Sequence, residues 1–152
     1  MEHITDKVAQ GYQVTKNVNR CVFTGDTIFV GGCGRFFEGE PHEMAAAMTV
    51  ARDVLPADTK MFCGHEYTVA NLNFCAIADP TNEKVLAKRS EAIASREASV
   101  WTVPTKLSDE REFNVFMRCF DADMQTLTGT SNPTDCIGFL RQWKNSGNKP
   151  QL

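Results

Sequence analysis

Two short stretches of the chain place a side chain with metal-binding chemistry directly after an apolar run and a glycine. In residues 22–29, VFTGDTIF, this side chain is Asp26, and in residues 61–68, MFCGHEYT, it is His65. Carboxylate oxygen binds hard divalent metals, and imidazole nitrogen suits zinc and iron. Each preceding glycine allows a sharp turn at the strand end. The pattern predicts that both side chains meet at one sheet edge; the alternatives are a turn or capping aspartate and an ordinary surface or core histidine.

Length, charge and hydropathy limit the class of protein. The 152 residues suffice for one ordinary domain, and the formal net charge of -3 argues against a nucleic-acid partner, because phosphate-binding surfaces are usually basic. No stretch reaches the roughly 20 apolar residues of a membrane helix. The N-terminal sequence also lacks the pattern of an export signal. We therefore expect neither nucleic acid nor a membrane as a partner.

Six cysteines are scattered along the chain without a C-x-x-C pair. Most lie in apolar runs, which favours reduced, buried thiols over a disulfide framework. This usage is typical of the cytoplasm or the mitochondrial matrix. A zinc site that uses cysteine remains an alternative, because Cys63 stands beside His65.

Hydrophobic spacing and breaker residues predict short strands first and helices afterwards. The predicted fold class is α/β or α+β, with a helical C-terminal half. A glycine-rich loop, GGCGRFFEGEP, follows the first strands, and TVPTKL is predicted to be a connector. The predicted strands are 11–15, 21–24, 27–30 and 60–63, and the predicted helices are 41–55, 66–78, 82–98 and 133–144.

The motifs FTGDTIFVGGCGRFFEG, FCGHEYTVANLNF, TVPTKL, FNVFMR and LRQWK occur in this order. Their combination resembles the hydroxyacylglutathione hydrolases, or glyoxalase II, of the metallo-β-lactamase superfamily, from about residue 21 to residue 144. The resemblance implies that residues 1–79 are the second half of a metallo-β-lactamase αββα sandwich. Residues 80–152 would then form a helical glutathione-binding domain. The implied reaction is hydrolysis of S-D-lactoylglutathione to glutathione and D-lactate, in methylglyoxal detoxification.

The same resemblance assigns roles to single residues. Asp26 would bridge two divalent metals, zinc or iron, and His65 would bind one of them, with the pair taking part in catalysis through a metal-held hydroxide. The remaining matched positions would bind the glutathione part of the substrate: Arg35, Phe37, Tyr67, Arg141 and Lys144. Phe37 stands where the family often has a tyrosine, so one substrate hydrogen bond would be lost. Without the resemblance, the R-x-x-K pair at the end of the chain reads as a solvated helix face.

The sequence departs from the family pattern at the metal site. The family takes further ligands from an H-x-H-x-D-H motif, whereas the histidines of this chain are His3, His42 and His65. The expectation is a C-terminal half of the hydrolase, with an incomplete ligand set and an apolar sheet face left exposed. A separate chain that supplies the first half is one alternative. The others are a non-catalytic module that binds glutathione thioesters and a half-domain structural partner.

Overall fold

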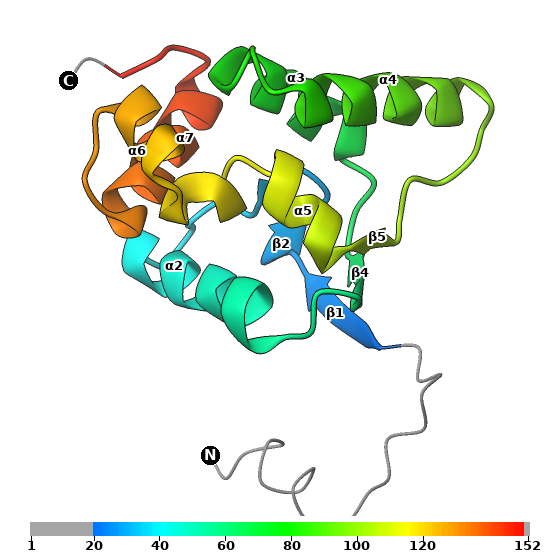
Figure 1. The fold of residues 1–152 in the computed structure, drawn as a ribbon, viewed down its shortest axis with the longest axis horizontal. Coiled ribbons are helices and arrows are strands. Elements are labelled where there is room, and N and C mark those ends of the chain that lie inside the picture. Colours follow the sequence, from blue (N-terminus) through cyan, green and yellow to red (C-terminus); the bar gives the residue numbers. More distant parts are fainter. Residues whose placement is uncertain (1–19, 151–152) are drawn as a thin grey trace, which may run out of the picture.

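Helices make up most of the molecule, and Figure 1 shows the larger of its two small sheets to one side of them, with its first strand at the edge. This computed structural model describes residues 20–150. The mixed α/β class confirms the coarse prediction from the sequence. In chain order the elements are β1 (Cys21–Gly25), β2 (Ile28–Phe29), β3 (Gly32–Cys33), α2 (Pro41–Thr49), the π-helical turn η1 (Val50–Val54), β4 (Lys60–Cys63), α3 (Thr68–Ala78), α4 (Glu83–Glu97), β5 (Thr105–Lys106), α5 (Leu107–Phe113), the 3-10 turn η2 (Met117–Phe120), α6 (Ala122–Thr128) and α7 (Pro133–Ser146).

The larger sheet places the ends of two strands side by side. Its strand order is β1-β4-β5, with β1 parallel to β4 and β4 antiparallel to β5. Val22 pairs with Met61, and Gly25 pairs with Cys63 after an irregularity in β1. Because parallel strands run in the same direction, the residues that follow β1 and β4 emerge at the same edge. β2 and β3 form a separate two-stranded hairpin.

The helix boundaries follow the capping chemistry of the sequence. α2 begins at Pro41, where the Glu40 backbone N–H donates to the Glu43 carboxylate at 2.8 Å. α7 begins after Asn132, whose side chain accepts from the Asp135 N–H at 2.9 Å. The predicted helices 41–55, 82–98 and 133–144 are confirmed within a few residues. The helix predicted from residue 66 begins at Thr68 instead.

The hydrophobic core lies between the helices and the buried side of the strands. Five fully buried side chains show its extent: Met48 of α2, Met61 of β4, Leu72 of α3, Phe116 just before η2, and Leu140 of α7. These residues come from almost the whole described length, so the α-helical region and the strands share one core. Burial of each such side chain stabilises the fold by about 1.5–3 kcal/mol.

Parts of the fold differ from the prediction or escaped it. The segment TVPTKL is not only a connector, because Thr105 and Lys106 form β5 and pair with Met61 and Lys60. The elements α5, η2 and α6 had no individual prediction. The strand predicted at 11–15 lies outside the described residues.

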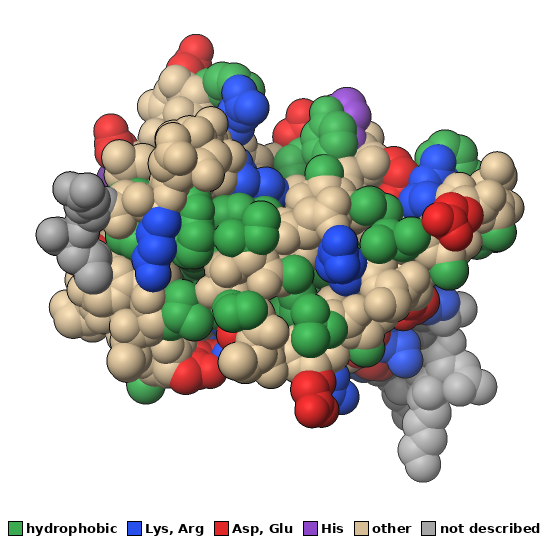
Figure 2. Space-filling view, turned by 90° about the horizontal axis from the view of Figure 1, so that it is seen from above, with side chains coloured by type: hydrophobic (Ala, Val, Ile, Leu, Met, Phe, Trp, Pro, Cys, Tyr) green, Lys and Arg blue, Asp and Glu red, His purple; other side chains and the backbone are tan. Residues whose placement is uncertain are grey.

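Apolar side chains also reach the surface. Phe23 on β1 is 79% exposed and its ring stacks on Phe62 at a centroid distance of 5.3 Å. On the side seen in Figure 2, apolar side chains are interspersed with Lys and Arg side chains. Ile77 of α3 and Leu86 of α4 are exposed. Among residues 20–150, no helix is long and apolar enough to cross a membrane. Four cysteines, Cys33, Cys75, Cys119 and Cys136, are buried thiols.

Candidate active site

The side chains of Asp26 and His65 meet at the carboxyl edge of the larger sheet. His65 Nε2 lies 3.4 Å from Asp26 Oδ1, and the two side chains are 50% and 69% exposed. Asp26 follows β1 and His65 comes shortly after β4, so the parallel pairing of these strands explains the approach. The structure thus brings together the two candidate metal ligands of the sequence.

Glycines at this edge leave room for Asp26. A Cβ on Gly64 would lie 2.5 Å from Asp26 Oδ1, and the Gly64 N–H donates to the Gly25 carbonyl at 2.8 Å. A Cβ on Gly34 would come well inside 3.0 Å of the Asp26 carbonyl oxygen, which is backbone. Gly64 therefore admits the carboxylate, and Gly34 lets the glycine-rich loop pass directly behind the turn.

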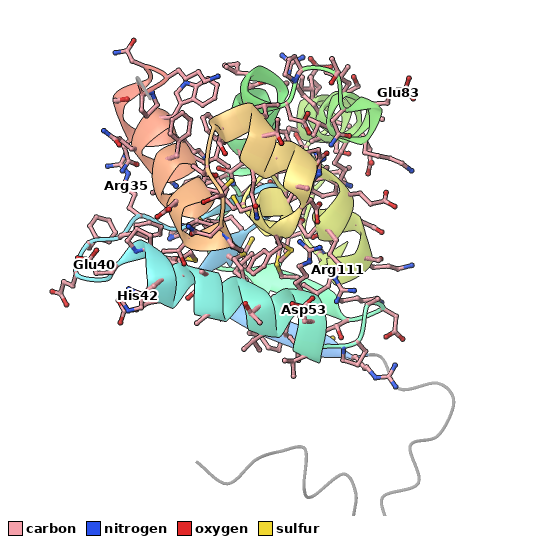
Figure 3. All side chains as sticks on the ribbon, turned by 60° about the vertical axis from the view of Figure 1, so that its left-hand side comes forward. Arg35, Glu40, His42, Asp53, Glu83 and Arg111 are labelled. Carbon is pink, nitrogen blue, oxygen red and sulfur yellow. The ribbon has the colours of Figure 1, made fainter. Side chains whose placement is uncertain are left out.

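The described residues supply only part of a metal site. Asp26 and His65 offer one oxygen and one nitrogen donor, whereas a catalytic zinc usually has at least three protein ligands. Among residues 20–150, no group of three or more His, Cys, Asp and Glu side chains could hold a metal ion. The Cys63 thiol donates to the His65 carbonyl at 3.3 Å. His42 lies at the start of α2 and is exposed, as Figure 3 shows. Asp26 and His65 can therefore supply two ligands to a metal ion, but they do not make a complete metal site.

A cavity of about 550 Å³ opens beside Asp26. Six of the seven residues that the sequence singles out line it, and they come from the strand edge, the glycine-rich loop, the turn before α3 and α7. His65 is the exception, although it stacks on the cavity residue Tyr67 at 5.0 Å. The lining residues are Asp26, Phe29, Cys33, Gly34, Arg35, Phe37, Tyr67, Asn71, Arg141 and Lys144.

Arg141, which is buried, and Lys144, which is half-buried, form a cationic wall of this cavity. Arg141 is 6% exposed; its Nη1 donates to the Cys33 carbonyl at 2.8 Å and its Nε donates to Asn145 Oδ1 at 3.0 Å. Lys144 Nζ donates to Asn71 Oδ1 and lies 5.6 Å from the ring centre of Phe74. Burial, together with the neighbouring positive charge of Arg141, lowers the pKa of Lys144 to about 8. The R-x-x-K pair is therefore not a solvated helix face.

Arg35 and Phe37 bring the glycine-rich loop to the mouth of the cavity. Both side chains are exposed, Phe37 by 87%. In Figure 3, Arg35 projects from the outer side of the molecule near α7. Arg35 lines the same cavity as Arg141 and Lys144, so it adds a third positive charge to the cavity wall.

The turn that carries His65 and Tyr67 is held from the other side. Glu66 Oε2 accepts from the Thr102 N–H at 3.0 Å, and Glu66 Oε1 accepts from the Thr102 hydroxyl. Tyr67 packs edge-on against Phe29 at 5.2 Å. These contacts fix the turn between the cavity and the segment before β5.

A buried carboxyl on α5 supports the hairpin that leads into the cavity. Glu110 is fully buried, and its Oε2 accepts from the Gly31 N–H at 3.0 Å and from Asn114 Nδ2 at 2.9 Å. Its Oε1 accepts from the Thr105 hydroxyl at 2.6 Å. Burial raises the pKa of Glu110 to about 7, although these hydrogen bonds act in the opposite direction.

Sequence reasoning missed four cavity residues: Phe29, Cys33, Gly34 and Asn71. Asn71 carried the best signal, because it is a polar residue inside the mostly apolar run of α3. Cys33 lines the cavity as a thiol, and burial raises its pKa to about 11, so it is not a nucleophile at neutral pH.

The sequence of this chain is similar to the sequences of a class of hydrolases. The family described as hydroxyacylglutathione hydrolase C-terminus matches residues 66–147. A relative named "Hydroxyacylglutathione hydrolase cytoplasmic" from Arabidopsis thaliana is 42% identical over 130 residues, which are 83% of this chain and 50% of the relative. "Hydroxyacylglutathione hydrolase" from Aeromonas hydrophila is 40% identical over 81% of this chain and 50% of its own length. "Hydroxyacylglutathione hydrolase-like protein" from Gallus gallus is 40% identical over 86% of this chain and 46% of its own length.

The chain belongs to the hydroxyacylglutathione hydrolase family, which confirms the resemblance found in the motifs. The match includes Tyr67 and the whole of α7, so it covers the turn after β4 and the R-x-x-K pair. The chain spans about half the length of the curated relatives it matches.

Proposed function

We propose that this chain carries the glutathione-binding cavity and two metal ligands of a hydroxyacylglutathione hydrolase. The substrate is S-D-lactoylglutathione, and the products are glutathione and D-lactate, in methylglyoxal detoxification. One observation carries the proposal: Arg35, Arg141 and Lys144 line one cavity. Within residues 20–150, none of the three forms an ion pair with a carboxylate.

A buried cation without an acidic partner indicates an anionic ligand. Lys and Arg are almost never fully buried unless they are paired. Glutathione carries two carboxylates, and a guanidinium binds a carboxylate through parallel N–H donors. Arg141 and Lys144 would hold one carboxylate at the closed end of the cavity, and Arg35 would steer the ligand at its mouth. Tyr67 and Phe37 would pack against the glutathione backbone.

Asp26 and His65 would hold divalent metal, zinc or iron, beside the cavity. A bound metal of this kind supplies a water that ionises near neutral pH and stabilises charge on a carbonyl oxygen. Asp26 lines the cavity itself, so a thioester attached to the bound glutathione would lie within its reach. The further ligands would come from the metallo-β-lactamase part of the hydrolase, with β1 to β4 belonging to the second half of its αββα sandwich.

The same proposal includes a boundary between two domains and a cellular compartment for the protein. We place the end of the sandwich part at residue 79, with the helical glutathione-binding domain from residue 80. The Arabidopsis relative is named cytoplasmic, and we propose the cytoplasm or the mitochondrial matrix for this chain.

Thioester hydrolysis and metal content test the enzyme proposal together. The chain loaded with zinc or iron is assayed for loss of S-D-lactoylglutathione, alongside Asp26→Asn and His65→Ala. His42→Ala is the matched control, because His42 is exposed on α2, away from the strand ends. We expect both site variants, but not the control, to lower whatever metal content and turnover the parent chain shows. Less than one equivalent of bound metal together with no turnover would remove the enzyme proposal for this chain. Retained binding of S-methylglutathione would then leave a non-catalytic binding module.

The exposed ring of Phe23 favours a second candidate, a half-domain that completes another sheet layer. Phe23 and Phe62 form a stacked apolar pair on the open face of the sheet. Such a face is normally covered. Light scattering after gel filtration tests this candidate: a monomeric, well-folded chain would count against it.

A further inference from the structure

The side-chain amide of Asn71 connects two parts of the cavity wall. Asn71 lies on α3 and is 4% exposed. Its Nδ2 donates to the Val30 carbonyl at 2.9 Å, and its Oδ1 accepts from Lys144 Nζ. The two partners fix the orientation of the amide, because the reversed amide would place its NH2 group against the ammonium and its oxygen against a carbonyl.

The hairpin packs against this amide without a gap. A Cβ on Gly32 would lie 2.8 Å from both Cγ and Nδ2 of Asn71, closer than real contacts allow. Gly32 also accepts from the buried Asn114 Nδ2 at 3.2 Å, which holds the hairpin from the opposite side. The amide therefore has little room to rotate, and the position of Lys144 Nζ is tied to the hairpin.

The surroundings of Lys144 leave its charge without compensation. Arg141 on α7 lies nearby and lowers the pKa of Lys144, as burial does; Cys75 on α3 and Cys33 on β3 face it as thiols. The rings of Phe74 and Phe116 lie 5.6 and 5.9 Å from Nζ. In residues 20–150, no carboxylate forms an ion pair with Lys144. An amide oxygen orients the ammonium but adds no negative charge, whereas an aspartate of the same size would neutralise it.

We propose that Asn71 is a positioning residue that holds the Lys144 ammonium at the cavity wall with its charge available to an anionic group of the ligand. The inference rests on the proposed glutathione site and adds a residue that the motif resemblance did not assign. Asn71 acts through Lys144 and through the hairpin, not by chemistry on the substrate.

The substitution Asn71→Asp tests this role, because it keeps the size of the side chain and adds one negative charge. Asn73→Asp is the matched control on the same helix; Asn73 is exposed and its Oδ1 accepts from Arg89 at 2.6 Å. The first readout is the pKa of Lys144 in the ligand-free protein, followed by NMR of its side-chain carbon and assigned with Lys144→Met. We expect Asn71→Asp to raise this pKa and Asn73→Asp to leave it unchanged.

The second readout is the affinity for S-methylglutathione near neutral pH. We expect Asn71→Asp to weaken binding about tenfold or more, as for the loss of an interaction with a charged group, and Asn73→Asp to change it less than about twofold. In the Lys144→Met background, the effect of Asn71→Asp should shrink, because the residue acts through Lys144.

The two readouts separate failure of this inference from failure of the proposed function. An unchanged Lys144 pKa in Asn71→Asp overturns the positioning role. A raised pKa in a protein that never binds S-methylglutathione supports the role and overturns the glutathione site. If Asn71→Asp does not fold, Asn71→Ser removes the amide without adding charge. The pKa of Lys144 should then fall, because the ammonium loses its acceptor, and an unchanged value contradicts the inference.

Discussion

His65 Nε2 lies 3.4 Å from Asp26 Oδ1, although the two residues belong to separate motifs at the ends of two parallel strands. Both side chains are at least half exposed. The fold therefore brings an oxygen and a nitrogen donor to one point on the surface, where an ion pair alone gains little.

The Asp26–His65 pair should contribute almost nothing to stability. An exposed pair of this kind is worth about 0–1 kcal/mol, because water screens it. Asp26→Asn and His65→Ala should each change the free energy of unfolding in urea by less than about 1 kcal/mol, measured without metal. A much larger loss in either variant would mean that the pair supports the fold, and the proposed ligand role would lose its main rationale.

Gly34→Ala should destabilise the protein and disturb the Asp26 turn. The added Cβ would overlap the Asp26 carbonyl oxygen, which cannot rotate away as a side chain could. Overpacking of this kind costs about 1–3 kcal/mol. The control is Gly147→Ala, where a Cβ meets nothing within 4 Å, although φ is +73°. The backbone cost there is about 1–2 kcal/mol, without any effect on metal or ligand binding. Equal metal and ligand affinities in Gly34→Ala and the parent protein would contradict the steric argument.

Glu110 should make the protein less stable as the pH rises through neutrality. Its pKa is about 7 in the folded chain, against an ordinary value of 4.5. A carboxyl group whose pKa is higher in the folded than in the unfolded protein stabilises the fold at pH values below its unfolded pKa. This stabilisation is lost as the pH rises through its folded pKa. The difference between the two pKa values corresponds to roughly 3 kcal/mol. Urea unfolding at about pH 5 and about pH 8 measures it.

Glu110→Gln is the control for this pH dependence. The Gln oxygen can accept from Gly31 and Asn114 while its NH2 group faces the Thr105 hydroxyl, so the network retains its pairing. The extra loss of stability between the two pH values should disappear in the variant. Parallel stability curves for the two proteins would show that Glu110 is not the titrating group.

Ligand affinity should fall as the pH rises through about 8, the pKa of Lys144. Only the ammonium form of Lys144 attracts a carboxylate. Each pH unit above the pKa lowers the fraction of Lys144 in this form about tenfold. For S-methylglutathione, a change from about pH 7 to about pH 9 should weaken binding about tenfold. Lys144→Met gives the baseline set by titration of the ligand itself. Identical pH profiles in the two proteins would exclude Lys144 from the site.

The proximity of the candidate site residues was easier to predict from the sequence than the short elements β5, α5, η2 and α6. Asp26 and His65 follow glycines at the ends of apolar runs, and strand ends meet wherever the strands pair in parallel. The motifs also marked Arg35, Tyr67 and the R-x-x-K pair, which line one cavity with Asp26. β5 and α5 had no such signal: β5 has two residues, and its pairing with β4 depends on contacts distant in the sequence.

Asn71 and Glu110 show why single positions escape such reasoning. In the sequence, a Glu in a short polar helix looks like a solvent-exposed position, and an Asn in an apolar run stands out without revealing its partners. Their roles depend on where the β2–β3 hairpin packs, because the Val30 carbonyl and the Gly31 N–H are their partners. No local pattern encodes that arrangement.

Titration calorimetry with S-methylglutathione tests the central claim, that the cation-lined cavity binds the glutathione moiety. The parent chain is compared with Lys144→Met, Arg35→Ala and the control Lys106→Met, whose side chain is exposed on β5 outside the cavity. We predict binding that weakens about tenfold or more in Lys144→Met, two- to fivefold or so in Arg35→Ala, and not at all in Lys106→Met. Equal affinity in all four proteins, or no binding by the parent chain, would contradict the account.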